Sequence, residues 1–243
     1  MKRILTGLAA GGLMLAGAGA ALGDGPAYTS VKDVPHHEHF TWSGFYGGLS
    51  VGGMSSKIKG NFQNAPGFFW DSGKQSDAVA GLHGGYQHQF GSFVLGLEGG
   101  YKSVLSHKFS SKIAGGAGAP CGFVAAVQSC EGRVDSILQI GGRVGYAVQT
   151  VLLYGTGGYA VGSLDTQGSS ANGQPFSGGG AEHRGGFYGA GLEYAATKNL
   201  ILGVEYTHYN LDSNVHFTPS ATDSRTVSAK SDAVTARISF KTN

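Results

Sequence analysis

The chain contains eight segments in which apolar and polar residues alternate, joined by connections that are alternately short and long. The segments span residues 42–54, 78–90, 93–102, 133–148, 151–163, 183–197, 200–211 and 233–240. Tight links near residues 91, 149 and 198 alternate with Gly/Ser/Asn-rich stretches over 55–77, 105–132, 164–182 and 212–229. Alternation with a period of two is typical of β-strands, and short turns at one rim with long loops at the other are typical of outer-membrane barrels. The sequence therefore predicts an all-β fold, an eight-stranded antiparallel up-and-down transmembrane β-barrel over residues 42–240.

Each alternating segment separates an apolar face from a polar face. In the third segment Phe93, Leu95 and Leu97 fall on one face, and Glu98 and Lys102 fall on the other. Because lipid offers no hydrogen-bond partners, every backbone group of a spanning sheet must pair within the protein and the sheet must close. We therefore expect the apolar faces to contact lipid.

The same reasoning assigns further residues to the lipid-facing wall. In the fourth segment the alternation places Val134, Leu138 and Ile140 there, opposite Asp135 and Gln139. Aromatic side chains are enriched where a membrane protein meets the interface. Six outward aromatic residues are expected to form such girdles: Phe45, Phe90, Phe93, Tyr146, Tyr188 and Tyr206.

The polar faces carry charged residues that are expected to line the lumen. They are Glu98, Lys102, Asp135, Arg143, Glu193, Glu205 and Arg237. The four acidic and three basic groups nearly balance one another. Since eight strands enclose an interior just wide enough for side chains to fill, we interpret this set as a structural ion-pair network rather than a catalytic or permeation site.

Composition excludes several other fold classes. Glycine supplies 44 of the 243 residues, and an interior glycine destabilises a helix by about 1 kcal/mol relative to alanine. Only 13% of residues are charged while 41% are hydrophobic, which argues against disorder. A secreted soluble β-sandwich is the alternative, although such a fold does not need apolar residues on one face of every strand.

The N-terminus has the pattern of an export signal. Lys2 and Arg3 precede an apolar run over 4–22 that ends in small residues, as in a cleaved secretory signal peptide. We expect a signal peptide over 1–23, and an N-terminal membrane anchor is the alternative. Loss of Lys2 and Arg3 lowers the 17 basic residues to 15, equal to the 15 acidic ones, so no basic surplus predicts nucleic-acid binding.

The remaining parts are short. Residues 24–41 are polar, contain two prolines and read as a periplasmic linker, and residues 241–243 form a short tail. Cys121 and Cys130 are close together in a Gly/Ala-rich stretch of an exported chain, which predicts a disulfide. A metal-binding pair is the alternative, but their spacing differs from that of zinc sites.

Four groups of residues are candidate sites. The histidine cluster 36–39 suits a transition metal, and His107, His183 and His216 suit haem, but solvated histidines are the preferred reading. The stretch 155–160 resembles a dinucleotide fingerprint without the helix that such a motif needs. The aromatic group of the first long connection is expected to contact a partner, lipid headgroups or itself: Phe62, Phe68, Phe69 and Trp70. No catalytic arrangement is present, so we expect a non-enzymatic protein without cofactor or metal.

The segment Thr41-Trp42-Ser43-Gly44-Phe45-Tyr46-Gly47-Gly48 carries a family resemblance. It resembles the first strand of alphaproteobacterial outer-membrane immunogenic proteins, porin-family relatives of the small OmpA/OmpX-like barrels. Residues 84–87, 96–99 and 205–206 are similar to later positions of that family. The resemblance implies an outer-membrane surface antigen or porin-like protein, with haem binders among its relatives. Family members usually end in an aromatic residue that the barrel-assembly machinery recognises, whereas here three residues follow Phe240.

These observations predict a protein of the Gram-negative outer membrane with long loops outside the cell and both termini in the periplasm. We expect a structural, envelope-integrity or surface-interaction role with a filled lumen. A narrow porin-like channel or a haem receptor is the alternative. The expected partners are outer-membrane lipid, the barrel-assembly machinery and an extracellular partner bound through the long loops.

Overall fold

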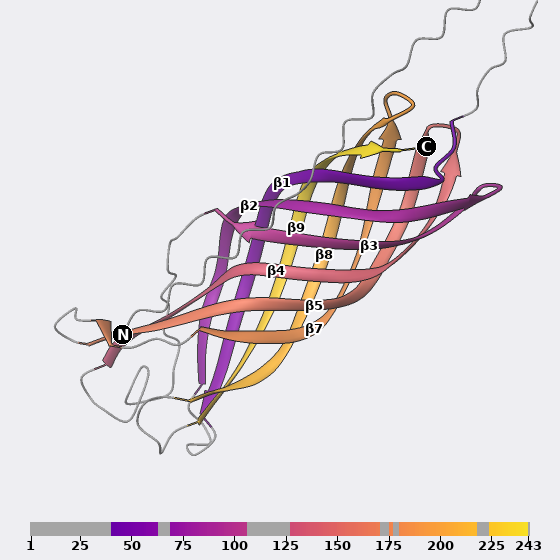
Figure 1. The fold of residues 1–243 in the computed structure, drawn as a ribbon. Helices are drawn as coiled ribbons and strands as arrows, with labels where there is room; N and C mark the ends of the chain where they lie inside the picture. The colour runs from indigo at the N-terminus through magenta and orange to yellow at the C-terminus, as the bar shows by residue number, and fades with distance from the viewer. Residues whose placement is uncertain are drawn as a thin grey trace, which may run out of the picture. The chain divides into compact units, whose positions relative to one another are not determined.

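A computed structural model describes residues 40–62, 69–105, 127–170, 175–176, 180–217 and 224–242. These residues form nine strands and no helix (Figure 1): β1 (Gly44–Phe62), β2 (Phe69–Phe90), β3 (Phe93–Val104), β4 (Val127–Val148), β5 (Val151–Ser170), β6 (Pro175–Phe176), β7 (Gly180–Ala195), β8 (Leu200–Phe217) and β9 (Ser224–Lys241). Within the described part of the chain, no helix is long and apolar enough to cross a membrane.

Eight of the strands form a closed antiparallel barrel. Each pairs with its neighbour along the chain, and β1 pairs with β9 to complete the ring. The two-residue β6 adds only to the end of β5, at Gly168 and Ser169. The predicted fold class, an eight-stranded antiparallel barrel, is therefore confirmed.

The pairing register fixes how the strands are staggered. A path of directly paired residues that starts at Gly48 returns to β1 ten residues further on, at Ile58, through His83, Gly100, Gln139, Ala160, Gly185, Leu211 and Ala229. A stagger of ten residues around eight strands corresponds to a strand tilt of about 40°. The interior is therefore narrow and side chains fill it.

The tight links form the turns that the sequence predicts. Gly91-Ser92 joins β2 to β3 and Gln149-Thr150 joins β4 to β5. The first residue of each link has positive φ, 61° at Gly91 and 54° at Gln149. Glycine adopts this conformation without strain, whereas glutamine does so at a cost.

The long connections are shorter than predicted, because the strands continue into them. The first was expected over 55–77, but β1 ends at Phe62 and β2 begins at Phe69. The strands likewise extend into the other three long connections. Strand pairing depends on backbone hydrogen bonds, so it continues where the apolar alternation has stopped.

Several sequence predictions fall outside the described residues. They are the signal peptide 1–23, the linker as far as residue 39 with its histidine cluster, Phe68, His107 and Cys121. The side chains of Phe62, Phe69, Trp70, Cys130 and His216 are not described either, although their backbones lie in strands. The disulfide therefore remains a prediction.

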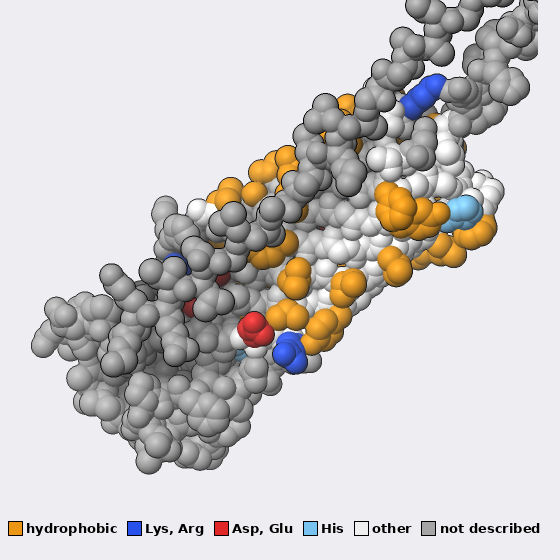
Figure 2. All heavy atoms as spheres, in the orientation of Figure 1, with side chains coloured by type: hydrophobic (Ala, Val, Ile, Leu, Met, Phe, Trp, Pro, Cys, Tyr) orange, Lys and Arg blue, Asp and Glu red, His pale blue; other side chains and the backbone are white. Residues whose placement is uncertain are grey.

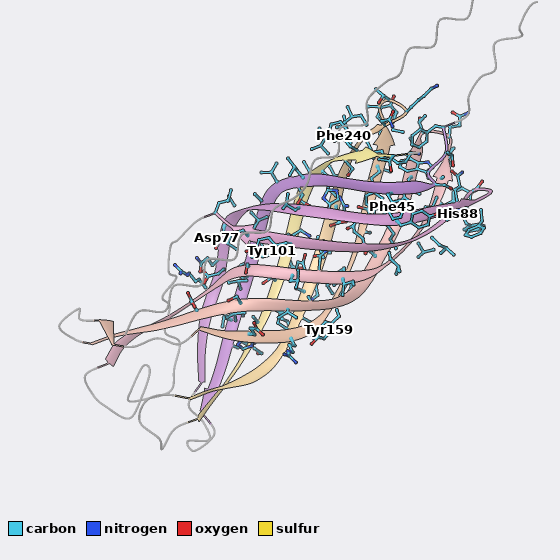
Figure 3. All side chains as sticks on the ribbon, in the orientation of Figure 1. Phe45, Asp77, His88, Tyr101, Tyr159 and Phe240 are labelled. Atoms are coloured by element: carbon cyan, nitrogen blue, oxygen red, sulfur yellow. The ribbon has the colours of Figure 1, made fainter. Side chains whose placement is uncertain are left out.

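Alternation along the strands produces an apolar outer wall. Figure 2 shows apolar side chains distributed over the outside of the barrel. All six aromatic residues predicted for the girdles are exposed, from 43% at Tyr206 to 66% at Phe45. In Figure 3, Phe45 and Phe240 lie near the tight-turn end of the barrel, while Tyr101 and Tyr159 lie nearer the other end.

Because of a β-bulge in β4, the face predicted for Val134 is wrong. The register with β5 slips between Val134 and Ser136, which leaves Asp135 as an extra residue. Beyond the bulge the alternation is out of phase, because a one-residue shift exchanges the two faces of a strand. Val134 is therefore buried inside, where the sequence had predicted a lipid-facing residue.

Candidate functional site: an ionic layer between two apolar clusters

The barrel interior contains two apolar clusters. The turn-side cluster consists of residues next to the tight turns: Trp42, Val94, Ala147, Leu152, Tyr154, Ala195 and Ile201. The loop-side cluster lies toward the opposite strand ends: Met54, Ile58, Val79, Val134, Ile137, Ala160, Leu164, Phe187, Tyr209, Leu211, Ala229 and Ala233. Both clusters occupy positions where a water-filled pore would need polar side chains.

Trp42 anchors the turn-side cluster from outside the strands. Its side chain is fully buried. Its backbone N–H donates to Gln89 Oε1 at 2.8 Å, and its indole Nε1–H donates to the Gln149 carbonyl at 3.3 Å. Phe40 packs edge-on against it, with ring centroids 4.9 Å apart. The residues before β1 therefore close the barrel at its tight-turn end.

An ionic layer lies between the two clusters. Its members come from five strands and their side chains are at most 7% exposed: Glu98, Lys102, Arg143, Glu193, Glu205 and Arg237. These are six of the seven residues predicted to line the lumen, and the structure brings them together. Three carboxylates face three cations, so the described layer is formally neutral. That balance matters because an unpaired buried charge is costly.

Arg237 is the centre of the layer. Its guanidinium binds Glu98 through two bonds, Nη1 to Oε1 at 3.1 Å and Nη2 to Oε2 at 2.5 Å. It also contacts the Glu205 carboxylate in a short ion pair. The planar guanidinium suits such two-pronged carboxylate binding. One side chain on β9 thereby links β3 to β8 across the lumen.

Arg143 and Lys102 complete the network on either side. Arg143 donates to Glu193 at 2.8 Å and to Glu98 at 3.4 Å, and its guanidinium carbon lies 4.0 Å from the centre of the Tyr154 ring. Lys102 Nζ donates to Tyr209 Oη at 2.8 Å and lies 3.6 Å from Glu205.

Neutral hydrogen-bonding groups add further bonds to the carboxylates of Glu98 and Glu205. The Tyr46 hydroxyl donates to Glu98 at 2.8 Å, and the Tyr154 hydroxyl donates to Glu205 at 2.8 Å. Thr207 donates to Glu205 at 3.1 Å. The sequence reasoning did not identify these partners, because inward tyrosines look the same in sequence as the outward tyrosines of the girdles.

Asp135, the seventh predicted lumen residue, is placed elsewhere. Its carboxylate lies 2.6 Å from Arg133 Nε, and Arg133 also contacts Asp165 at 3.1 Å. The side chain is 33% exposed, and it sits beyond the outward apolar run of β4. Partial burial and the neighbouring Asp165 carboxylate raise the pKa of Asp135. The bulge at this residue separates it from the ionic layer.

A small cavity borders the ionic layer. It has a volume of about 10 Å³, and Glu98, Lys102, Glu205 and Arg237 contribute to its lining. A space of this size holds about one water molecule. The cavity cannot hold an organic substrate or a haem group.

Two of the candidate ligand groups lie at least partly within the described residues. His183 lies on β7 and is fully buried. The glycine-rich stretch 155–160 lies inside β5. No group of three or more His, Cys, Asp or Glu residues that could hold a metal occurs in the part of the chain that the structure describes.

A closed eight-stranded barrel with an apolar outer wall and a packed interior defines the class of small outer-membrane barrels. Residues 27–240 match the family model described as "Outer membrane protein beta-barrel domain". The chain belongs to that family and is an outer-membrane β-barrel protein. Among curated proteins, none matches the chain.

Three of the solved structures that match the chain are outer-membrane proteins. The attachment invasion locus protein Ail of Yersinia pestis is 15% identical, with coverage of 82% of this chain and 99% of Ail and a TM-score of 0.40. OprG of Pseudomonas aeruginosa is 11% identical, with coverage of 83% and 97% and a TM-score of 0.45. The outer-membrane protease OmpT of Escherichia coli is 11% identical, with coverage of 82% and 97% and a TM-score of 0.45. At these identities and TM-scores the matches say nothing about the role of this chain.

Proposed function

We propose that this protein is a non-conducting surface protein of the outer membrane, with a structural or surface-interaction role. The observation that carries the proposal is the closure of the interior by the turn-side cluster, the ionic layer and the loop-side cluster in succession. A diffusion channel needs a continuous polar path, and three successive packed layers oppose one. The long connections are then the part of the molecule available to an extracellular partner.

The alternation of short and long connections supports one orientation of the barrel in the outer membrane. Tight turns belong on the periplasmic rim of bacterial barrels and longer connections on the outer rim. We propose that both termini and Trp42 lie on the periplasmic side. Phe40 to Ser43, which include the last two residues of the linker, then serve as a periplasmic plug.

The end of the last strand supports recognition by the barrel-assembly machinery. Phe240 points outward and is 61% exposed, whereas Lys241 is inward and its Nζ donates to the Ser43 carbonyl at 2.9 Å. β9 includes Lys241, and the Thr242 amide donates to the Phe45 carbonyl at 2.8 Å. We propose that Phe240 acts as the terminal aromatic signal although it is not the last residue.

Planar-bilayer recording of the purified, folded protein tests the closed lumen. We expect no stable conductance from the unmodified protein. A matched pair of variants sharpens the test: Glu98→Ala removes the main partner of Arg237, while Glu182→Ala removes an exposed carboxylate outside the layer. Large, stable channels from the unmodified protein would contradict the proposal.

A narrow, gated channel is the second candidate, and the ionic layer itself favours it. Buried ion pairs can exchange partners, and both Arg237 and Arg143 already contact Glu98. If Glu98→Ala conducts while Glu182→Ala does not, the layer is a latent gate. If neither variant conducts, the apolar clusters close the lumen on their own.

A further inference from the structure

The plug, Phe40 to Ser43, closes the tight-turn end of the barrel without being part of the sheet. None of these four described residues belongs to a strand, and β1 begins directly after them at Gly44. The Trp42 side chain is nevertheless fully buried in the turn-side cluster, whose other members come from five strands. Side-chain packing and individual hydrogen bonds therefore hold the plug in place, rather than strand pairing.

Gly44 joins the plug to β1 and has the properties of a hinge. Its φ of 136° lies in a region that glycine adopts freely and that other residues rarely adopt. A Cβ at this position would also collide with the carbonyl oxygen of Thr242. The next residue, Phe45, is paired with Tyr86 of β2. Rotation about the two backbone dihedrals of Gly44 would therefore move the plug without unpairing the rest of β1.

The C-terminal tail contacts the chain on both sides of this hinge. Lys241 is only 2% exposed; its Nζ donates to the Ser43 carbonyl at 2.9 Å and lies 5.4 Å from the centre of the Phe40 ring. The amide of the next residue, Thr242, donates to the Phe45 carbonyl at 2.8 Å. Lys241 therefore holds the movable side of the hinge, and Thr242 holds the side that belongs to the sheet.

The remaining bonds to the plug come from β2 and from the turn between β4 and β5. Gln89 accepts from the Trp42 amide through Oε1, and its own amide donates to Ser43 Oγ at 3.0 Å. The Trp42 indole donates to the carbonyl of Gln149, whose φ of 54° is unfavourable for a residue other than glycine. Each of these is an isolated bond that can break while the strands stay paired.

We propose that the plug opens on Gly44 as a unit while the eight-stranded barrel stays closed, and that Lys241 of the C-terminal tail holds it shut. Segments held by a few isolated bonds open at a lower free energy than the strands of a core. The inference rests on the closed lumen proposed above, since an open plug would remove the seal at the tight-turn end and leave the ionic layer as the next barrier. It also gives the residues after Phe240 a role, because Lys241 reaches Ser43 only after β9 has paired with β1.

Hydrogen exchange of the Trp42 indole Nε1–H, followed by NMR on the folded mature chain in lipid nanodiscs, measures this opening. The chain has two tryptophans, so Trp70→Phe leaves Trp42 as the source of the indole signal. When closing is faster than chemical exchange, the exchange rate is proportional to the fraction of open plug. After correction for intrinsic rates, we expect weaker protection of this proton than of the Leu97 amide, because Leu97 of β3 is paired on both sides.

Lys241→Met removes the ammonium group that holds the plug and keeps an unbranched side chain. Loss of a hydrogen bond from a charged donor should raise the open fraction, and with it the exchange rate, about ten-fold to a hundred-fold. Gln89→Leu removes the acceptor of the Trp42 amide and should also accelerate exchange, which tests the plug from its other side if Lys241→Met fails to form a closed barrel. Lys230→Met is the matched control, because Lys230 is an exposed lysine of the same strand, away from the plug; it should leave the rate unchanged.

Two results would overturn the proposal. One is equal protection of the Trp42 indole and the Leu97 amide, which would show that the plug opens only when the whole barrel unfolds. The other is an unchanged exchange rate in Lys241→Met, with the barrel closed as judged by heat-dependent gel mobility. Neither readout depends on conductance, so a failure here leaves the proposed non-conducting role intact. Large channels from the unmodified protein would instead contradict that role.

Discussion

Replacing Arg237 by methionine should destabilise the barrel strongly, because Arg237 holds two carboxylates in the ionic layer. Its guanidinium binds Glu98 through two bonds and also contacts Glu205. Removal of one partner from a buried ion pair costs about 3–5 kcal/mol. Arg143 and Lys102 stay near the two carboxylates, at 3.4 and 3.6 Å. We therefore expect a loss at the lower end of that range, about 3 kcal/mol.

The charge balance of the layer gives a sharper form of this prediction. Arg237→Met leaves three acidic groups facing two basic ones, whereas Glu98→Gln leaves two facing three. The double variant Arg237→Met/Glu98→Gln restores neutrality. It should therefore be more stable than the sum of the single losses predicts, by about 2 kcal/mol, because the two groups are in direct contact.

Reversible urea unfolding in lipid vesicles, followed by heat-dependent gel mobility, measures the three free energies. Tyr101→Phe is a suitable control, since Tyr101 lies on the same strand as Glu98 but on the outer wall, with a side chain that is 43% exposed. If the losses of the two single variants simply add in the double variant, the two side chains are not energetically coupled. The ionic layer would then be a set of independent contacts, and the reasoning from charge balance would be refuted.

Three further predictions follow from particular contacts. Gly48→Ala should destabilise the barrel by about 1–3 kcal/mol, because a Cβ added at Gly48 would lie 2.1 Å from the Ile238 carbonyl oxygen. Gly47→Ala should change the stability little, because a Cβ added there would lie 3.8 Å from its nearest neighbour. Equal losses of stability in urea unfolding would contradict this prediction. Trp42→Ala should cost about 3–5 kcal/mol because the indole is fully buried in the turn-side cluster, and Trp42→Phe should recover part of the loss in the same assay. Hydrogen bonds from His208 and Tyr206 hold the pKa of Asp232 below its usual range, so their stabilising contribution should be present at neutral pH and decline as the pH falls through that lowered pKa; an NMR titration of the Asp232 carboxyl carbon should show the midpoint rise in a His208→Phe/Tyr206→Phe variant.

The sequence predicts the barrel well because one physical constraint acts along its whole length. Lipid on one side and a polar layer on the other impose a period of two, so Phe93, Leu95 and Leu97 are outward and Glu98 and Lys102 inward, as expected. Six charged residues of the ionic layer follow from the same alternation. The partners within the layer do not, because the alternation gives the face of a residue but not the stagger of ten residues that decides which side chains meet across the lumen.

The bulge at Asp135 could not be predicted for a related reason. The sequence around Asp135 has no feature that marks a bulge. The alternation looks regular on either side until the pairing with β5 is known. Only the register shows that Val134 points inward and that Asp135 lies outside the ionic layer, where it pairs with Arg133. This displacement also changes the charge balance, from four acidic and three basic groups to three of each.

The closure of the lumen depends on residues that the alternation alone would misread. Val79 lies between Ala78 and Ala80, so the sequence offers apolar residues on both faces of β2, yet only Val79 is buried. In a barrel with a water-filled pore, the inward residues at both ends would be polar. Apolar residues would then occupy only the lipid-facing side of each strand. Here they occur near both ends of the interior and enclose the charges in a water-poor space. There each ion pair is stronger and each unpaired charge more costly than in water. The apolar clusters and the ionic layer therefore depend on each other, and a variant that opens the turn-side cluster should also weaken the ion pairs above it.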